Sequence, residues 1–209
     1  MSQGSTRRFL IIAVLFVIVA TLSAFADPVE MRFAGVGGQN QNGEYTYPYF
    51  LTIDNGPQFP AICDDFYHES NVGDTWQANL TQLSSGDLSK TRFGILVQYQ
   101  EAGYLLMQMR DDDQPEWGNI NFAVWKIFNP SVDMGPTPPG TLGPQYWYNL
   151  AQTADLSKVD FSTVMIATPL DAQGASGDQE FLFLTPEPGT LMLIGSGVIT
   201  LLSACRRFV

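Results

Sequence analysis

The sequence predicts an α+β fold: a mainly antiparallel β-sheet or sandwich with a helical insertion at about residues 93–154. Three observations support this. Short segments rich in β-branched and aromatic residues come first and are separated by turn signals. Segments with a helical apolar period follow, and two more β-like segments close the domain. Strands, then helices, then strands favour an α+β architecture, and residues 27–184 are of ordinary size for one domain.

Four strands are expected in the first half of this domain, at residues 29–36, 45–53, 59–67 and 75–83. Clusters of Gly, Asn, Asp and Pro lie between them and are typical of turns. Pro48 within the second strand indicates a sheet edge or a bulge, because proline cannot donate to the ladder. We therefore expect these four strands to form an antiparallel meander.

Three helices are expected next. Apolar residues recur with a helical period over residues 93–110 and 116–128, and the second of these ends before Asn129-Pro130. A Pro/Gly-rich connector precedes the third helix, at residues 145–154. Residues 161–169 and 180–184 then read as a closing hairpin of two strands.

The N-terminal 26 residues have the pattern of a secretory signal peptide. Arg7 and Arg8 precede a long apolar run, and the small residues Ala24 and Ala26 predict cleavage after Ala26. A retained N-terminal anchor is the alternative, because the apolar run is long for a signal. The general secretion route fits better than a twin-arginine route, since Phe9 directly follows the arginine pair.

The C-terminal stretch 189–205 contains 17 residues without a charge. As a helix it would reach about 25 Å, the low end for crossing a hydrocarbon core of roughly 30 Å. Arg206 and Arg207 follow it and are expected on the cytoplasmic side, where they stop transfer. Arg7 and Arg8 are cytoplasmic by the same rule, so residues 27–185 are predicted to lie across the membrane.

Pro186, Glu187 and Pro188 stand just before this predicted transmembrane helix, and two prolines favour an extended segment that a protease can bind. A stiff stalk is the alternative interpretation. The order Pro-Glu-Pro, short apolar helix and terminal basic pair resembles the PEP-CTERM sorting signal of Gram-negative bacteria. The resemblance implies export, transient anchoring in the inner membrane, cleavage near residues 186–188 by an exosortase-type enzyme, and delivery to the cell surface.

The exported part is strongly acidic. Four of the ten basic residues lie in the two end segments, so six basic and 21 acidic residues remain between Asp27 and Glu187, a formal net charge of −15. Nucleic acid is excluded as a partner because its phosphates need neutralising Lys and Arg. Docking on anionic lipid is disfavoured for the same reason. The charge fits a soluble extracellular protein.

Few residues in this domain suggest chemistry. His68 is the single histidine, and no nucleophile elbow or His/Cys zinc cluster accompanies it. Asp64 and Asp65 could act in acid–base chemistry or bind Ca²⁺, but adjacent strand residues point to opposite faces. Asp111-Asp112-Asp113 is predicted to be a solvated loop. We predict neither a metal site nor a cofactor.

Cys63 is the only cysteine of the exported domain, which excludes an intramolecular disulfide there. Cys63-Asp64-Asp65, followed by Ala123-Val124-Trp125, resembles bacterial surface thioester domains. In that family a cysteine forms a thioester with a glutamine that precedes an Ala-aliphatic-Trp element. The matching position here is Asn121, which is one methylene shorter and puts thioester formation in doubt. The alternative is that Cys63 is a small buried hydrophobic residue.

The sequence as a whole predicts a non-enzymatic, exported cell-surface or matrix protein. Its predicted partners are signal peptidase, an exosortase-type enzyme and the inner membrane. Extracellular polysaccharide is a candidate ligand, through four tryptophans at positions 76, 117, 125 and 147. Two alternatives remain: a covalent adhesin that uses Cys63 and Asn121, and a secreted hydrolase that uses His68 or the Asp64–Asp65 pair.

Overall fold

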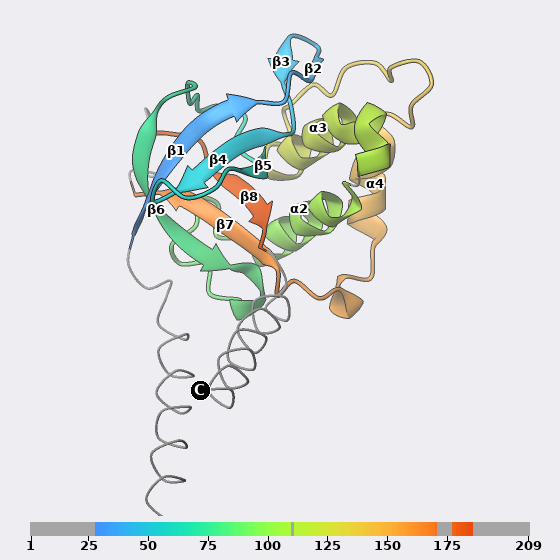
Figure 1. Ribbon diagram of the computed structural model, residues 1–209. Coiled ribbons are helices and arrows are strands. Elements are labelled where there is room, and N and C mark those ends of the chain that lie inside the picture. The colour runs from blue at the N-terminus through green and yellow to red at the C-terminus, as the bar shows by residue number, and fades with distance from the viewer. Residues whose placement is uncertain (1–27, 110, 171–176, 186–209) are drawn as a thin grey trace, which may run out of the picture.

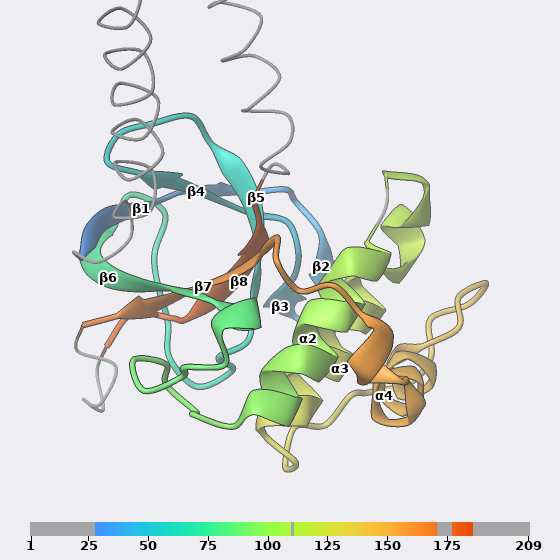
Figure 2. The same ribbon diagram turned by 90° about the horizontal axis from the view of Figure 1, so that it is seen from below.

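The computed structural model describes residues 28–109, 111–170 and 177–185. They form a closed barrel of six antiparallel strands with three α-helices packed on one side (Figures 1 and 2). The α+β prediction is confirmed. The barrel strands are β1 (Val29–Val36), β4 (Tyr49–Ile53), β5 (Phe59–Cys63), β6 (Thr75–Gln82), β7 (Val164–Pro169) and β8 (Phe181–Leu184).

Closure into a barrel replaces the predicted open sheet or sandwich. The strand order is β1-β4-β5-β8-β7-β6, and β1 pairs with both β4 and β6. The predicted meander is therefore wrong at its fourth strand: β8 pairs with β5 where β6 was expected. The register of β1 against β4 shifts between Phe33 and Gly35, and such a bulge increases the bend of a strand. The predicted closing hairpin of β7 and β8 is confirmed.

The barrel interior is an apolar core to which every strand contributes alternate residues. Large aromatic side chains, among them Phe33, Trp76 and Phe181, are packed against small ones such as Ala78 and Ala167. Alternating large and small residues fill the narrow interior of a small barrel. The strand periodicity of two thus assigns Cys63 to the interior and its neighbours Ile62 and Asp64 to the outer face.

A second core lies between the outer face of the barrel and the helices α2 (Leu96–Gln108), α3 (Trp117–Phe128) and α4 (Pro144–Thr153). Ile62, Ile166 and Leu182 supply the barrel side of this core. All three helices were predicted within a few residues. Short 3₁₀ turns join the elements: η1 (Leu83–Ser85), η2 (Asp111–Glu116) and η3 (Leu156–Lys158).

The predicted strand 45–53 is shorter because its first residues leave the barrel. Asn40–Gln41 and Glu44–Tyr45 form a separate small hairpin, β2 and β3. The backbone N–H of Tyr47 donates to the side chain of Asn121 at 2.8 Å, so it takes no part in the ladder. Strand β4 therefore starts after Pro48.

Both ends of the described domain leave the barrel on the same side. Strand β1 runs antiparallel to β6, β6 to β7, and β7 to β8. The starts of β1 and β7 and the ends of β6 and β8 therefore lie at the same end of the barrel. We call this the exit end and the opposite one the far end (Figure 1).

Within the described ranges, no helix is both long and apolar enough to cross a membrane. The predicted signal helix (1–26) and transmembrane helix (189–205) lie outside those ranges.

Candidate functional site

The residues predicted for sorting and processing lie outside the described part of the chain. These are Ala24, Ala26, Pro186, Glu187, Pro188, Arg206 and Arg207. The structure does describe the point from which the C-terminal segment departs. Leu184 is the last residue of β8, and Thr185 donates its backbone N–H to the carbonyl oxygen of Thr163 at 2.8 Å. The sorting segment therefore begins directly at the barrel, without a separate linker.

Cys63 and Asn121 are brought together at the far end, but through the backbone of Cys63. The Asn121 amide nitrogen donates to the Cys63 carbonyl oxygen at 3.1 Å, and its amide oxygen accepts the Tyr47 N–H. The side chain is completely buried and both of its ends are used. Asn121 thus ties helix α3 to β5 and to the segment before β4.

The Cys63 thiol is directed elsewhere. It donates to the carbonyl oxygen of Asp65 at 3.2 Å and is completely buried. Burial, and then the negative charges of Asp65 and Asp64, raise the pKa of this thiol well above its ordinary value. A thiol with a raised pKa is a poor nucleophile, because the thiolate is the reactive form. This environment favours a structural role for Cys63.

We accordingly expect the folded domain to retain both a free Cys63 thiol and an intact Asn121 amide. Intact-mass measurement of the purified protein should match the sequence without the loss of one ammonia, and methylamine should add nothing. Denatured protein should take up one thiol reagent at Cys63. A mass lower by one ammonia, restored by methylamine in the wild type and absent from Cys63→Ala, would instead establish a thioester.

The most polar buried group lies between the outer face of the barrel and α2. Glu180 is completely buried, and its carboxylate accepts hydrogen bonds from the hydroxyls of Tyr99 and Thr168 and from the backbone N–H of Arg92. The Asp64 carboxyl, 1% exposed, is a further buried neighbour of Glu180. Strands β5, β7 and β8 and helix α2 each border this cluster.

Two buried carboxyl groups in contact cannot both be ionised at low cost. Burial, and then the charge of Glu180, raise the pKa of Asp64 well above its ordinary value. Among the described residues, no other side chain donates a hydrogen bond to the Asp64 carboxyl oxygens. Burial also raises the pKa of Glu180, but its three donors counteract this rise, so the proton that the two carboxyls share is favoured on Asp64.

A second polar cluster, nearer the surface, contains Asp65, His68 and Arg92. The Asp65 carboxylate lies 2.9 Å from the Arg92 guanidinium and 2.8 Å from His68 Nδ1. Asp65 also accepts the backbone N–H groups of Tyr67 and His68, while Arg92 donates to the carbonyl oxygen of Asp178 at 2.6 Å. The Asp65 and Arg92 side chains are buried, and that of His68 is 21% exposed. This cluster joins the segment after β5 to the segments before α2 and β8.

The structure therefore separates the predicted Asp64–Asp65 pair. Asp64 faces Glu180 beneath α2, whereas Asp65 is paired with Arg92, in keeping with the opposite directions of adjacent side chains. His68 and Asp65 do meet, as a histidine–carboxylate pair that could orient an imidazole for acid–base chemistry.

Among the residues that the structure describes, no group of three or more His, Cys, Asp or Glu side chains is arranged to hold a metal ion. Nothing is described of the side chains of Asp111, Asp112 and Asp113.

Sequence reasoning missed Arg92, Tyr99 and Glu180, which organise both clusters. Arg92 stands in a polar connecting segment, and Glu180 looks like an ordinary charged residue before the strand sequence Phe-Leu-Phe-Leu. No motif marks them. Glu180 lies 81 residues from Tyr99 and 88 residues from Arg92, and Arg92 lies 86 residues from Asp178, so only the folded barrel reveals these contacts.

Comparison with known families identifies the end of the chain. A family model described as the PEP-CTERM protein-sorting motif matches residues 184–207. No curated protein and no solved structure matches the chain. The matched segment begins at Leu184, the final residue of β8, so the barrel and the motif are directly joined. Such a motif is typical of proteins that are exported, sorted at the membrane by an exosortase-type enzyme and delivered to the surface. The chain thus carries a PEP-CTERM sorting signal at the C-terminal end of its barrel domain.

Proposed function

We propose that the barrel domain is a non-enzymatic surface or matrix protein that is released from a temporary membrane anchor. The observation that carries this proposal is the PEP-CTERM motif at residues 184–207, placed at the exit of the barrel. Signal peptidase cleaves after Ala26, residues 189–205 hold the chain in the inner membrane, and an exosortase-type enzyme cuts near Pro186-Glu187-Pro188. The released domain then joins the extracellular layer.

The burial of the polar side chains supports a structural role over hydrolysis. Asp64, Asp65 and Glu180 are each at most 3% exposed, and their partners are other protein groups. Such carboxyls hold elements together and are not presented to a substrate. Only His68 reaches the surface from this region.

Extracellular polysaccharide is the ligand class that we propose for the released domain. Trp76, Trp125 and Trp147 are buried in the cores and cannot bind it, and the partly buried Trp117 packs edge-on against Tyr47. Tyr45, Tyr67 and Tyr146 are instead between 46% and 66% exposed. Aromatic rings with a polar tip can stack on sugars and form hydrogen bonds, so these tyrosines are the suitable residues.

The sorting proposal is tested by replacing Pro186, Glu187 and Pro188 with alanine in the full chain, expressed in a host with its exosortase. We expect the wild type to be recovered from the surface or matrix fraction without Val209. The triple variant should remain in the membrane fraction with Val209 still attached, as read by C-terminal mass analysis.

A matched control removes two prolines from the loop before α4, by replacing Pro138 and Pro139 with alanine. This variant should be processed and released like the wild type, since these prolines lie outside the matched motif. Release of the triple alanine variant at the wild-type rate would show that the motif does not direct sorting.

A further inference from the structure

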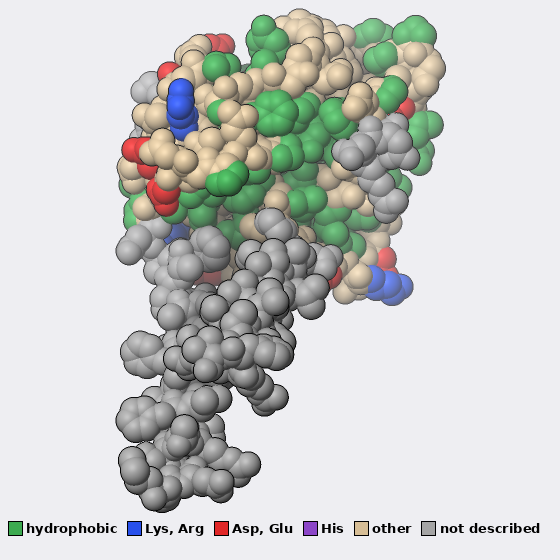
Figure 3. Space-filling view, in the orientation of Figure 1, with side chains coloured by type: hydrophobic (Ala, Val, Ile, Leu, Met, Phe, Trp, Pro, Cys, Tyr) green, Lys and Arg blue, Asp and Glu red, His purple; other side chains and the backbone are tan. Residues whose placement is uncertain are grey.

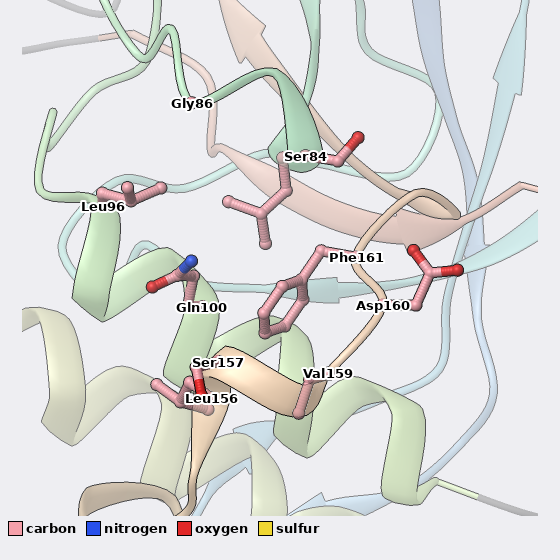
Figure 4. Close-up of a pocket in the computed structure, with 10 residues that line it drawn as sticks. Ser84, Gly86, Leu96, Gln100, Leu156, Ser157, Val159, Asp160 and Phe161 are labelled. Atoms are coloured by element: carbon pink, nitrogen blue, oxygen red, sulfur yellow. The ribbon is translucent and has the colours of Figure 1, made fainter.

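A groove of mixed apolar and polar lining lies at the exit end of the barrel, near the point where the chain leaves for its sorting segment. It has a volume of about 320 Å³ and runs between η1, the first turns of α2, and η3 with the following residues (Figure 4). Leu83 and Phe161 are its buried apolar residues, and Leu96, Leu156 and Val159 lie toward its rim. Polar residues complete the lining: Ser84, Gln100, Ser157 and Asp160.

The topology links this groove to the departing chain. Phe161 precedes by two residues Thr163, whose carbonyl oxygen binds the N–H of Thr185. Leu83 follows the last residue of β6, another strand that ends at the exit end. Leu184 pairs with Val164 and is 40% exposed on the outer face of β8.

Exposed aliphatic side chains continue this surface around the start of α2. Leu96 is 39% exposed, and its neighbours Ile95 and Val97 are 49% and 50% exposed. Leu184, at the end of β8, is a further exposed aliphatic residue, and the end of β8 and the start of α2 lie on different sides of the exit end (Figure 2). We call Ile95, Leu96, Val97 and Leu184 together the exit patch. The space-filling view shows apolar side chains across the middle of the face that Figure 1 presents (Figure 3); the start of α2 lies on the opposite side of the domain (Figure 2). Apolar surface that a soluble protein leaves uncovered often marks a contact with a partner.

The length of the chain beyond Thr185 identifies that partner. Only residues 186–188 separate Thr185 from Gly189, the first residue of the uncharged stretch. Four steps of an extended chain span at most about 14 Å. While residues 189–205 are in a bilayer, the exit end therefore cannot lie more than about 14 Å from the hydrocarbon core of that bilayer. The first strand also starts at this end, three residues after Ala26, so a signal peptide would enter the membrane on the same side.

We propose that the exit patch rests on the lipid surface while the C-terminal segment anchors the chain, with the half-exposed leucines inserted among the headgroups. This rests on the membrane anchoring in the proposed function. Tethering raises the effective concentration of the patch at the membrane, so a weak contact is sufficient. The net charge of the domain opposes anionic lipid, and apolar contact with a zwitterionic surface avoids that repulsion.

Docking would fix the distance between the membrane surface and the segment that the sorting enzyme must reach. With the domain seated, Pro186-Glu187-Pro188 is held at the level of the headgroups. Once the segment is cut, the tether is lost and the weak contact alone no longer retains the domain. The same surface thus positions the substrate and permits its release.

The test uses the full chain in phosphatidylcholine vesicles, with Cys205→Ser so that the buried Cys63 is the only other thiol. A fluorophore is attached through Ser84→Cys at the groove or, as a matched control, through Ser131→Cys. Both serines are exposed, and Ser131 lies beside Tyr67 after β5, toward the far end. Lipid-borne spin labels are expected to quench the Ser84 fluorophore strongly and the Ser131 fluorophore weakly.

Replacing Leu96 and Leu184 with serine should leave the chain in the vesicles but lower the ratio of docked to undocked domain by roughly tenfold or more. Val72→Ser, an equally apolar and 60% exposed position between β5 and β6, should change nothing. Equal quenching of the two fluorophores, or quenching that persists in the Leu96→Ser, Leu184→Ser variant, would overturn docking while leaving the anchor intact. A chain that fails to float with the vesicles would overturn the anchor as well.

Discussion

Replacing Glu180 with alanine is expected to lower the free energy of unfolding by about 3–5 kcal/mol, because three buried donors lose their acceptor at once. The truncation leaves the hydroxyls of Tyr99 and Thr168 and the N–H of Arg92 without their acceptor. Each orphaned buried donor costs about 1–3 kcal/mol. Urea unfolding followed by tryptophan fluorescence measures the change.

Two further variants show whether the loss belongs to the hydrogen bonds. Glu180→Gln keeps the shape and one acceptor oxygen, so its loss should be smaller than that of the alanine variant. Glu69→Ala, at an exposed position in the segment after β5, should be within about 0.5 kcal/mol of the wild type. An alanine variant at position 180 that loses less than about 1 kcal/mol would contradict the role of Glu180 as the centre of this cluster.

Replacing Asp64 with asparagine is expected to change how stability depends on pH. Burial and the charge of Glu180 raise the pKa of Asp64 in the folded protein, whereas an unfolded aspartate titrates near about 3.9. The folded state therefore keeps a proton that the unfolded state releases once the pH exceeds about 4. Stability consequently falls as pH rises from there to the raised pKa, by up to about 1.4 kcal/mol per pH unit.

Asparagine can still donate to Glu180 but has no proton to lose. As the pH rises from about 4 toward the raised pKa of Asp64, the free energy of unfolding of Asp64→Asn should therefore increase relative to that of the wild type. Urea unfolding at several pH values, with the exposed Asp133→Asn as control, measures the difference. Parallel pH profiles for wild type and Asp64→Asn would show that Asp64 does not retain the proton.

Much of the fold could be predicted from local patterns. The segments 29–36 and 75–82 alternate apolar and polar residues, and α3 shows a clear helical period, so these elements were located within a residue or two. The predicted strand 45–53 failed at its start because the N–H of Tyr47 binds Asn121, which lies 74 residues away. Local propensity carries no information about such a partner.

The candidate site residues, like the strands and helices, could be predicted only in part. Asp64, Asp65 and His68 were singled out by type and spacing, and their burial at one end of the barrel could not be foreseen. Glu180 and Arg92 had no signal at all. Cys63 and Asn121 were singled out as a possible thioester pair; they do lie near each other, but their contact runs through a backbone carbonyl and not through the thiol.

The sequence by itself determined the predicted export and sorting of this protein. Sorting signals are short linear patterns of charge, apolar length and proline, and the export and sorting enzymes recognise them before or without folding. The sequence also determined the element types, since these depend on neighbours a few residues apart. Only the tertiary structure decided that the sheet closes, that Asp64 meets Glu180, and that both ends of the described domain leave the barrel on the same side. These outcomes depend on pairings between distant segments, whose registers are fixed by the packing of the whole barrel.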